Sequence, residues 1–97
     1  NSNSSPRGFH AHKKLEQLMI CIKGSLEVVL DDGKSRKMIK LETPETALCI
    51  KPGYWREMHN FTSDCVVMVL ASDHYDEADY IRSYSDFLQW KENLDGK

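Results

Sequence analysis

The 97-residue sequence is poor in the features that mark secreted, membrane-spanning and nucleic-acid-binding proteins. It has only three cysteines, an odd number without CxxC spacing, which disfavours a disulfide framework and a zinc site. No apolar run approaches the ~20 residues that cross a bilayer, and no signal peptide is apparent. With 13 Lys and Arg against 15 Asp and Glu, the chain lacks the basic excess of proteins that bind nucleic acid or anionic membranes.

These absences predict a cytoplasmic protein without nucleic-acid or membrane partners. Cys21, Cys49 and Cys65 lie in apolar runs, so we expect buried thiols in a reducing compartment. A hydrophobic fraction of 40% and a charged fraction of 29% are typical of a single globular domain at this length. The polar start, NSNSSP, predicts a disordered or tag-derived lead over residues 1–6, followed by one domain over residues 7–97.

The rest of the chain alternates short apolar runs with turn residues, as all-β proteins do. Asp31, Asp32 and Gly33 between two such runs predict a hairpin. From Ser83, a possible N-cap (Ser83 or Ser85) precedes apolar residues, which predicts a short C-terminal helix. The strand-like segments have no helical period between them and favour an antiparallel sandwich or barrel. They are residues 18–22, 25–30, 34–41, 47–50, 55–61 and 65–71.

Two of the four histidines, His10 and His12, stand one residue apart. Side chains alternate between the faces of a strand, so His10, His12 and Lys14 would point to the same side. Such a pair on its own fits metal ligands, proton-transfer residues or a solvated strand face. The spacing by itself does not choose between these three.

The surroundings of the pair resemble the two sequence motifs of the cupin superfamily. His10, His12 and Glu16 form H-x-H-x₃-E, the form of the first motif, and KPGYWREMHN over residues 51–60 resembles the second. Arg56 stands where the second motif has a histidine that serves many cupins as a metal ligand. Arginine stays protonated and has no lone pair for a metal. This departure favours proton transfer on an anionic substrate over metal binding.

Longer strings resemble a narrower family, the sugar-nucleotide 3,4-ketoisomerases of the WxcM-like, FdtA/QdtA type. These strings are RGFHAHKKLEQLMICIKGSLEVVLDDG, PGYWREMHNF and DCVVMVLASDHYDEADYIRSYSDF. The resemblance implies a cupin-type antiparallel β-barrel or jelly roll, no metal or cofactor, and a homodimer. It also implies conversion of a dTDP-4-keto-6-deoxyhexose to its 3-keto isomer, for deoxysugars of surface polysaccharides such as lipopolysaccharide. Family members carry further strands before the R-G-x-H-A-H string, and we expect the domain to lack them.

The resemblance also implies roles for individual residues. His10 is the candidate base at C3, and His12 the candidate partner that moves protons between the oxygens or to C4. The enediolate between these steps needs a cation, and the diphosphate and the nucleotide need cationic and aromatic contacts. The candidates for substrate binding are Arg7, Lys14, Trp55, Arg56, Tyr75 and Arg82.

Two other functions stay open at this point. One is a metal-dependent, oxygenase-like small cupin with His10, His12 and Glu16 as ligands, and the other is a non-catalytic module that binds sugar nucleotides. Without a metal, we expect Glu16 to hydrogen bond a histidine or a backbone amide. We interpret His59 and His74 as polar rim residues and the acidic run over residues 73–79 as a solvated turn.

Overall fold

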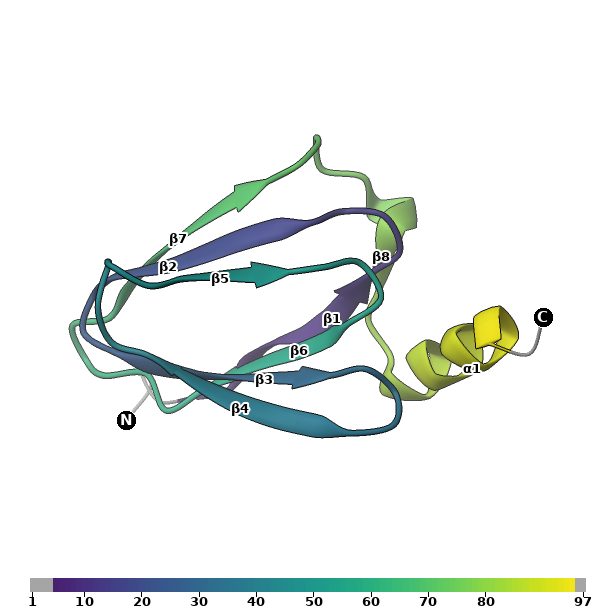
Figure 1. Ribbon diagram of the computed structural model, residues 1–97, viewed down its shortest axis with the longest axis horizontal. Coiled ribbons are helices and arrows are strands. Elements are labelled where there is room, and N and C mark those ends of the chain that lie inside the picture. Colours follow the sequence, from purple (N-terminus) through teal and green to yellow (C-terminus); the bar gives the residue numbers. More distant parts are fainter. Residues whose placement is uncertain (1–4, 96–97) are drawn as a thin grey trace.

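The computed structural model describes residues 5–95 as two facing antiparallel β-sheets with one C-terminal helix (Figure 1). Of the predicted lead over residues 1–6, residues 1–4 lie outside the described residues, and Ser5 and Pro6 are exposed coil. The larger sheet has the order β4-β3-β6-β1-β8 and the smaller one the order β5-β2-β7. The predicted all-β, jelly-roll type of architecture is confirmed, although the sheets form an open sandwich rather than a closed barrel.

The larger sheet contains β4 (Arg36–Leu41), β3 (Leu26–Asp31), β6 (Trp55–His59), β1 (Arg7–His12) and β8 (Tyr80–Ile81). The smaller sheet contains β5 (Ala47–Ile50), β2 (Gln17–Lys23) and β7 (Val66–Ala71). A short 3₁₀ helix, η2 (Glu77–Asp79), precedes β8, and the chain continues into α1 (Tyr84–Asp95). Within residues 5–95, no helix has the length and apolar character needed to cross a membrane.

The main core lies between the two sheets, as the alternation of apolar residues predicts. On β3, Leu26, Val28 and Leu30 point inward, while the residues between them are half-buried. Burying one such side chain contributes about 1.5–3 kcal/mol. The predicted hairpin joins β3 to β4, where an oxygen of Asp31 accepts the N–H of Gly33 at 2.7 Å. The core residues are Met19, Cys21, Leu26, Val28, Leu30, Leu41 and Ile50.

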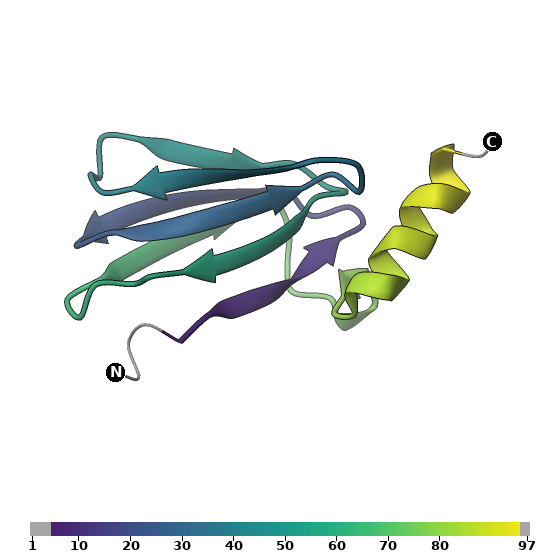
Figure 2. The same ribbon diagram turned by 90° about the horizontal axis from the view of Figure 1, so that it is seen from below.

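Helix α1 packs on the outer face of the larger sheet, near the end at which β1 finishes (Figure 2). Of the two N-cap candidates, Ser83 precedes the helix, and its hydroxyl accepts the N–H of Asp86 at 3.4 Å, whereas Ser85 lies within the first turn. Phe87 of the helix is fully buried against Ala11 and Trp55. This second, smaller core fixes the strand ends that carry the functional side chains.

The edge strand β7 is unusually exposed for an apolar strand. Among the described strands it pairs only with β2, and four of its apolar residues leave 41–51% of their surface in solvent: Val66, Met68, Val69 and Leu70. Edges of this kind are usually shortened, charged or covered. The side of the sandwich next to β7 is therefore an open, apolar face of the described chain.

Candidate active site

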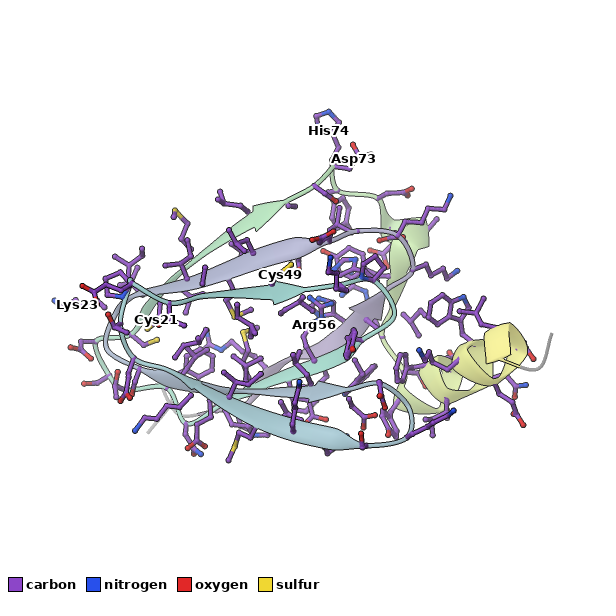
Figure 3. The ribbon with its side chains drawn as sticks, viewed as in Figure 1. Cys21, Lys23, Cys49, Arg56, Asp73 and His74 are labelled. Carbon is purple, nitrogen blue, oxygen red and sulfur yellow. The ribbon has the colours of Figure 1, made fainter. Side chains whose placement is uncertain are left out.

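The inner face of β1 and β6 carries a polar cluster inside the sandwich. His10 pairs with Arg56 across the two strands, so both side chains leave the sheet on the same face. The rings of His10 and His12 are 5.0 Å apart and nearly perpendicular, so the two histidines share that face as expected. Arg56 reaches across the interior to Gln17 on β2 of the other sheet (Figure 3). The cluster therefore lies between the sheets and not on the outer surface.

Arg56 is a buried cation with only neutral acceptors. Its side chain is 1% exposed, and its two terminal nitrogens donate to the amide oxygen of Gln17 and, at 3.3 Å, to the carbonyl of Tyr54. Its Nε has no partner among the described residues. Burial lowers the pKa of Arg56 to about 10, which still leaves it protonated at neutral pH. A buried charge without a counter-ion is costly, so the interior is suited to an anionic or electron-rich ligand.

Both histidines are neutral at neutral pH, for the same reasons. Burial lowers the pKa of His10 to about 4, and the positive charge of Arg56 adds to the effect. Burial and then Arg56 also lower the pKa of His12, although Asp79 works in the opposite direction. Neutral imidazoles have a lone pair to accept a proton, so the site contains two potential bases beside one cation.

Asp79 holds His12 in place, and it comes from the segment that we interpreted as a solvated turn. That interpretation is wrong for Asp79, because its Oδ2 lies 3.0 Å from Nδ1 of His12 and the side chain is only 11% exposed. Burial by itself raises the pKa of this carboxyl, but the N–H groups of Leu15 and Lys14 and the His12 ring outweigh it and lower the pKa. The carboxylate is therefore ionised and accepts three hydrogen bonds.

A cavity of about 170 Å³ opens beside His12. Lys14 lines it from a loop and not from a strand, because β1 ends at His12, so the expected strand alternation does not apply to Lys14. Asp73 and His74 line the outer part, at the tip of the loop after β7 (Figure 3). The remaining walls are formed by Leu15, Ser72, Asp76, Asp79 and Tyr80.

Tyr80 connects the histidines to two further predicted residues. Its ring centre lies 5.1 Å from that of His10 and 4.3 Å from that of His12. The guanidinium of Arg82 lies over the same ring at 4.2 Å, and the ring of Tyr75 is 5.3 Å away. The structure therefore brings His10, His12, Arg82 and Tyr75 together around one tyrosine, at the edge of the cavity.

Three comparisons place the chain among known proteins. The family described as FdtA, WxcM-like, C-terminal matches residues 1–92. The chain belongs to the WxcM-like family. It is 58% identical over 85 residues to the TDP-4-oxo-6-deoxy-alpha-D-glucose-3,4-oxoisomerase of Aneurinibacillus thermoaerophilus, covering 88% of this chain and 61% of that protein. The chain thus spans less than two thirds of this curated relative.

Solved structures of WxcM-like relatives share the fold over nearly the whole chain. The sugar 3,4-ketoisomerase QdtA of Thermoanaerobacterium thermosaccharolyticum, in complex with TDP, is 43% identical with a TM-score of 0.91, covering 95% of this chain and 67% of that one. A 3,4-ketoisomerase from Helicobacter canadensis is 47% identical with a TM-score of 0.90, covering 94% and 68%. The predicted family is therefore confirmed.

Two predicted substrate contacts of this WxcM-like chain lie away from the histidines. Trp55 faces the opposite side of β6 from Arg56, is buried under α1 beside Tyr84, and donates from Nε1 to Glu57 at 2.9 Å. It is a core residue and cannot stack on a ligand in the cavity. The guanidinium of Arg7 lies 4.6 Å over the ring of Phe61, at a second cavity of about 320 Å³. Neither residue joins the histidine cluster.

Glu16 does not join the cluster either, although the first motif contains it. Its Oε2 accepts from the thiol of Cys49 at 3.0 Å and lies 3.6 Å from Nζ of Lys51, so the expected bond to a histidine or backbone amide is wrong. In the described part of the chain, no three His, Cys, Asp or Glu side chains are grouped to hold a metal. The alternative ligand set of His10, His12 and Glu16 is thus not assembled. Cys49 is exposed and not buried as expected.

Sequence reasoning missed Asp79, Tyr80 and Gln17. The first two lie inside the family-like string DEADYIRSY, but an acidic residue in a polar run gives no local signal of a buried contact. Antiparallel pairing of His12 with Tyr80 brings this string to the histidines. Gln17 lies on the opposite sheet, so only the packing of the two sheets places it beside Arg56.

Proposed function

We propose that this protein is an isomerase that moves the keto group of a dTDP-4-keto-6-deoxyhexose from C4 to C3 through an enediol. The supporting observation is the pair of neutral imidazoles beside the buried Arg56 cation. Family membership supports the same reaction class, because relatives are named as 3,4-ketoisomerases of TDP-linked sugars. The product belongs to deoxysugar synthesis for bacterial polysaccharides.

The proposed chemistry is a pair of proton transfers at adjacent carbons. His10 accepts the proton from C3, and the electrons of that bond move toward O4 to form an enediolate. Arg56 stabilises the negative charge, because a preorganised cation in a dry site costs no reorganisation when charge develops. His12 accepts the proton of O3 and delivers it to O4, and the imidazolium of His10 returns a proton to C4. O3 becomes the carbonyl oxygen and O4 a hydroxyl, so the 3-keto sugar results with both imidazoles neutral again. Each half-step needs an imidazole that can both accept and donate.

We propose that the nucleotide part of the substrate lies along the outer part of the cavity beside His12. Lys14 and Arg82 supply positive charge there for the diphosphate, and Tyr75 supplies an exposed aromatic face for the base or sugar. Arg82 forms two hydrogen bonds to Glu77, at 2.8 and 3.1 Å. The diphosphate must therefore share or displace the Glu77 carboxylate.

The decisive experiment follows the ring protons of dTDP-4-keto-6-deoxyglucose by NMR in deuterated water. Loss of the C3 proton, with deuterium entering at C4 of the 3-keto isomer and at C3 of the remaining 4-keto substrate, supports the proposal. A suitable control histidine is His59, which is bonded to Glu57 at 2.9 Å and takes no part in the cluster, so His59→Asn should exchange at the wild-type rate. Binding of TDP without any exchange by the wild-type protein would refute catalysis and favour a sugar-nucleotide-binding module.

We also propose that the protein is a cytoplasmic homodimer in which a second copy covers the face beside β7. The exposed apolar side chains of this edge strand support the dimer. The reduced state of the cysteines supports the cytoplasm, because the sulfurs of Cys21 and Cys65 lie 4.0 Å apart without forming a disulfide. Leu70→Lys should convert the dimer to a monomer, as measured by light scattering after size exclusion. An unchanged mass in this variant, or a monomeric wild type, rules out this interface.

A further inference from the structure

We propose that Asp79 is the positioning residue of this site: it fixes His12 with its proton on Nδ1 and directs the unprotonated Nε2 toward the substrate. The consequence for turnover rests on the proposed isomerase function. The orientation and tautomer of His12 do not rest on that function, because they follow from hydrogen bonds within the chain. Asp79 has no contact with the reacting atoms in this proposal and acts only through His12.

The hydrogen bonds of the carboxylate leave one tautomer for His12. Oδ1 of Asp79 accepts the backbone N–H of Lys14 at 2.7 Å, and Oδ2 accepts the N–H of Leu15 at 3.1 Å. Oδ2 also lies 3.0 Å from Nδ1 of His12. Backbone N–H groups can only donate, so both oxygens of Asp79 act as acceptors. Against the effect of burial, these bonds also lower the pKa of the carboxyl, so it is an ionised carboxylate. The histidine nitrogen facing it must then carry the proton.

The other ring nitrogen of His12 is buried and unpartnered. The side chain is 0% exposed, and Nε2 has no hydrogen-bond partner among the described residues. Buried polar atoms are nearly always paired, so an unpaired one in a cavity wall marks a bond that a ligand completes. With the proton on Nδ1, Nε2 presents a lone pair and can accept a proton from the substrate. Arg56 Nε, the second unpartnered buried atom, belongs to the same cluster.

Asp79 also fixes the loop that follows β1. Its backbone carbonyl accepts the N–H of Lys13 at 3.0 Å, so one residue binds three consecutive N–H groups, those of Lys13, Lys14 and Leu15. Asp79 itself is held at the end of η2, where its N–H donates to Asp76 at 3.0 Å. The carboxylate thus connects the wall of the cavity to the catalytic histidine. Outer partners of this kind orient a histidine ring and set its tautomer.

The direct test is the tautomer of His12, read from nitrogen–proton correlation spectra of protein labelled with ¹⁵N-histidine. We expect the wild type to have its proton on Nδ1 and none on Nε2. In Asp79→Asn, an NH₂ group replaces one acceptor, so we expect a mixed or reversed tautomer. For turnover we expect kcat to fall roughly 10- to 100-fold with KM within about threefold, and Asp79→Glu to recover part of the loss.

Asp32→Asn is the matched control. An oxygen of Asp32 accepts the backbone N–H groups of Lys34 and Ser35, both at 2.9 Å, at a turn without a histidine. The Asp32→Asn variant loses the same type of hydrogen bond, from backbone N–H to carboxylate, as Asp79→Asn. Because no histidine is involved, we expect wild-type kcat and an unchanged His12 spectrum. A proton on Nε2 in the wild type, or wild-type kcat in Asp79→Asn, overturns the proposal. If Asp79→Asn does not fold, the wild-type spectrum alone decides, and it does so even if the protein proves inactive on the proposed substrate.

Discussion

The two faces of the β1–β6 strand pair have opposite chemical character, and the change occurs between neighbouring residues. His10 and Arg56 oppose each other on the inner face, whereas their neighbours Ala11 and Trp55 oppose each other on the outer face. At the end of the strand pair covered by α1, the outer face is apolar, and the one side-chain nitrogen of Trp55 donates to Glu57. The inner face contains a buried cation and, within residues 5–95, two buried polar atoms without hydrogen-bond partners. The outer face therefore stabilises the strand pair on which the reactive inner face depends.

Removing one histidine should have the largest effect on the inner face. His10→Asn keeps a polar side chain of similar shape but cannot take the C3 proton near neutral pH. We expect exchange at C3 to fall by roughly 10²- to 10⁴-fold, the usual contribution of a general base. TDP affinity, measured by calorimetry, should change little. Wild-type exchange in this variant would remove His10 from the mechanism.

The matching change on the outer face is Phe87→Ala. Phe87 is fully buried between α1 and the sheet, so truncation leaves a cavity and should cost about 3–5 kcal/mol of unfolding free energy. Denaturant titration measures this loss. The folded fraction should still show the wild-type tautomer of His12. A shift in that tautomer would mean that packing on the outer face also controls the protonation of His12 on the inner face.

Arg56→Met separates stability from activity on the inner face. Replacing a buried, unneutralised charge by an apolar side chain of similar length is often neutral or stabilising by about 1–4 kcal/mol. Exchange at C3 should nevertheless fall by roughly 10²- to 10³-fold, because the enediolate loses its cation. The positive charge of Arg56 lowers the pKa of both histidines, so their pKa values, followed by NMR, should rise in the variant. An active Arg56→Met protein contradicts the assigned role.

The smallest effect should be a pH dependence of stability. His10 has a pKa of about 4 in the folded chain, against 6.5 for an unperturbed histidine in the unfolded chain. Between these pH values the unfolded chain therefore binds more protons than the folded one. The contribution of His10 is fully present above pH 6.5 and is lost as the pH falls toward 4. His12, whose pKa is also lowered, adds to the same slope. Unfolding free energies across this range should fall less steeply in His10→Asn, and parallel curves would refute the assignment.

Several features could be read from the sequence because they depend on local patterns. The strand alternation, the hairpin at Gly33 and the helix after Ser83 all follow from residues close together in the chain. The common face of His10 and His12 follows from the same period of two. The two motifs also brought Arg56 into consideration, and the structure pairs it with His10 across the strands. Local geometry was sufficient for each of these.

Other features depend on which distant segments meet. Trp55 and Arg56 are adjacent and both large, and only the position of α1 decides that Trp55 is core while Arg56 faces the cavity. Glu16 was the natural partner for a histidine by motif, yet the end of β1 directs it to Cys49 and Lys51. No periodicity carries such information, because a side chain's partner depends on strand order and register.

By itself, therefore, the amino-acid sequence determined an all-β domain with two histidines on one face and an arginine in place of a metal ligand. Only the tertiary structure decided which carboxylate serves the histidines. Asp79 lies 67 residues from His12 and reaches it through the antiparallel pairing of β8 with β1. The physical reason is that a strand's own period states which side chains share a face, whereas burial, charge and tautomer depend on what the opposing segments bring to that face.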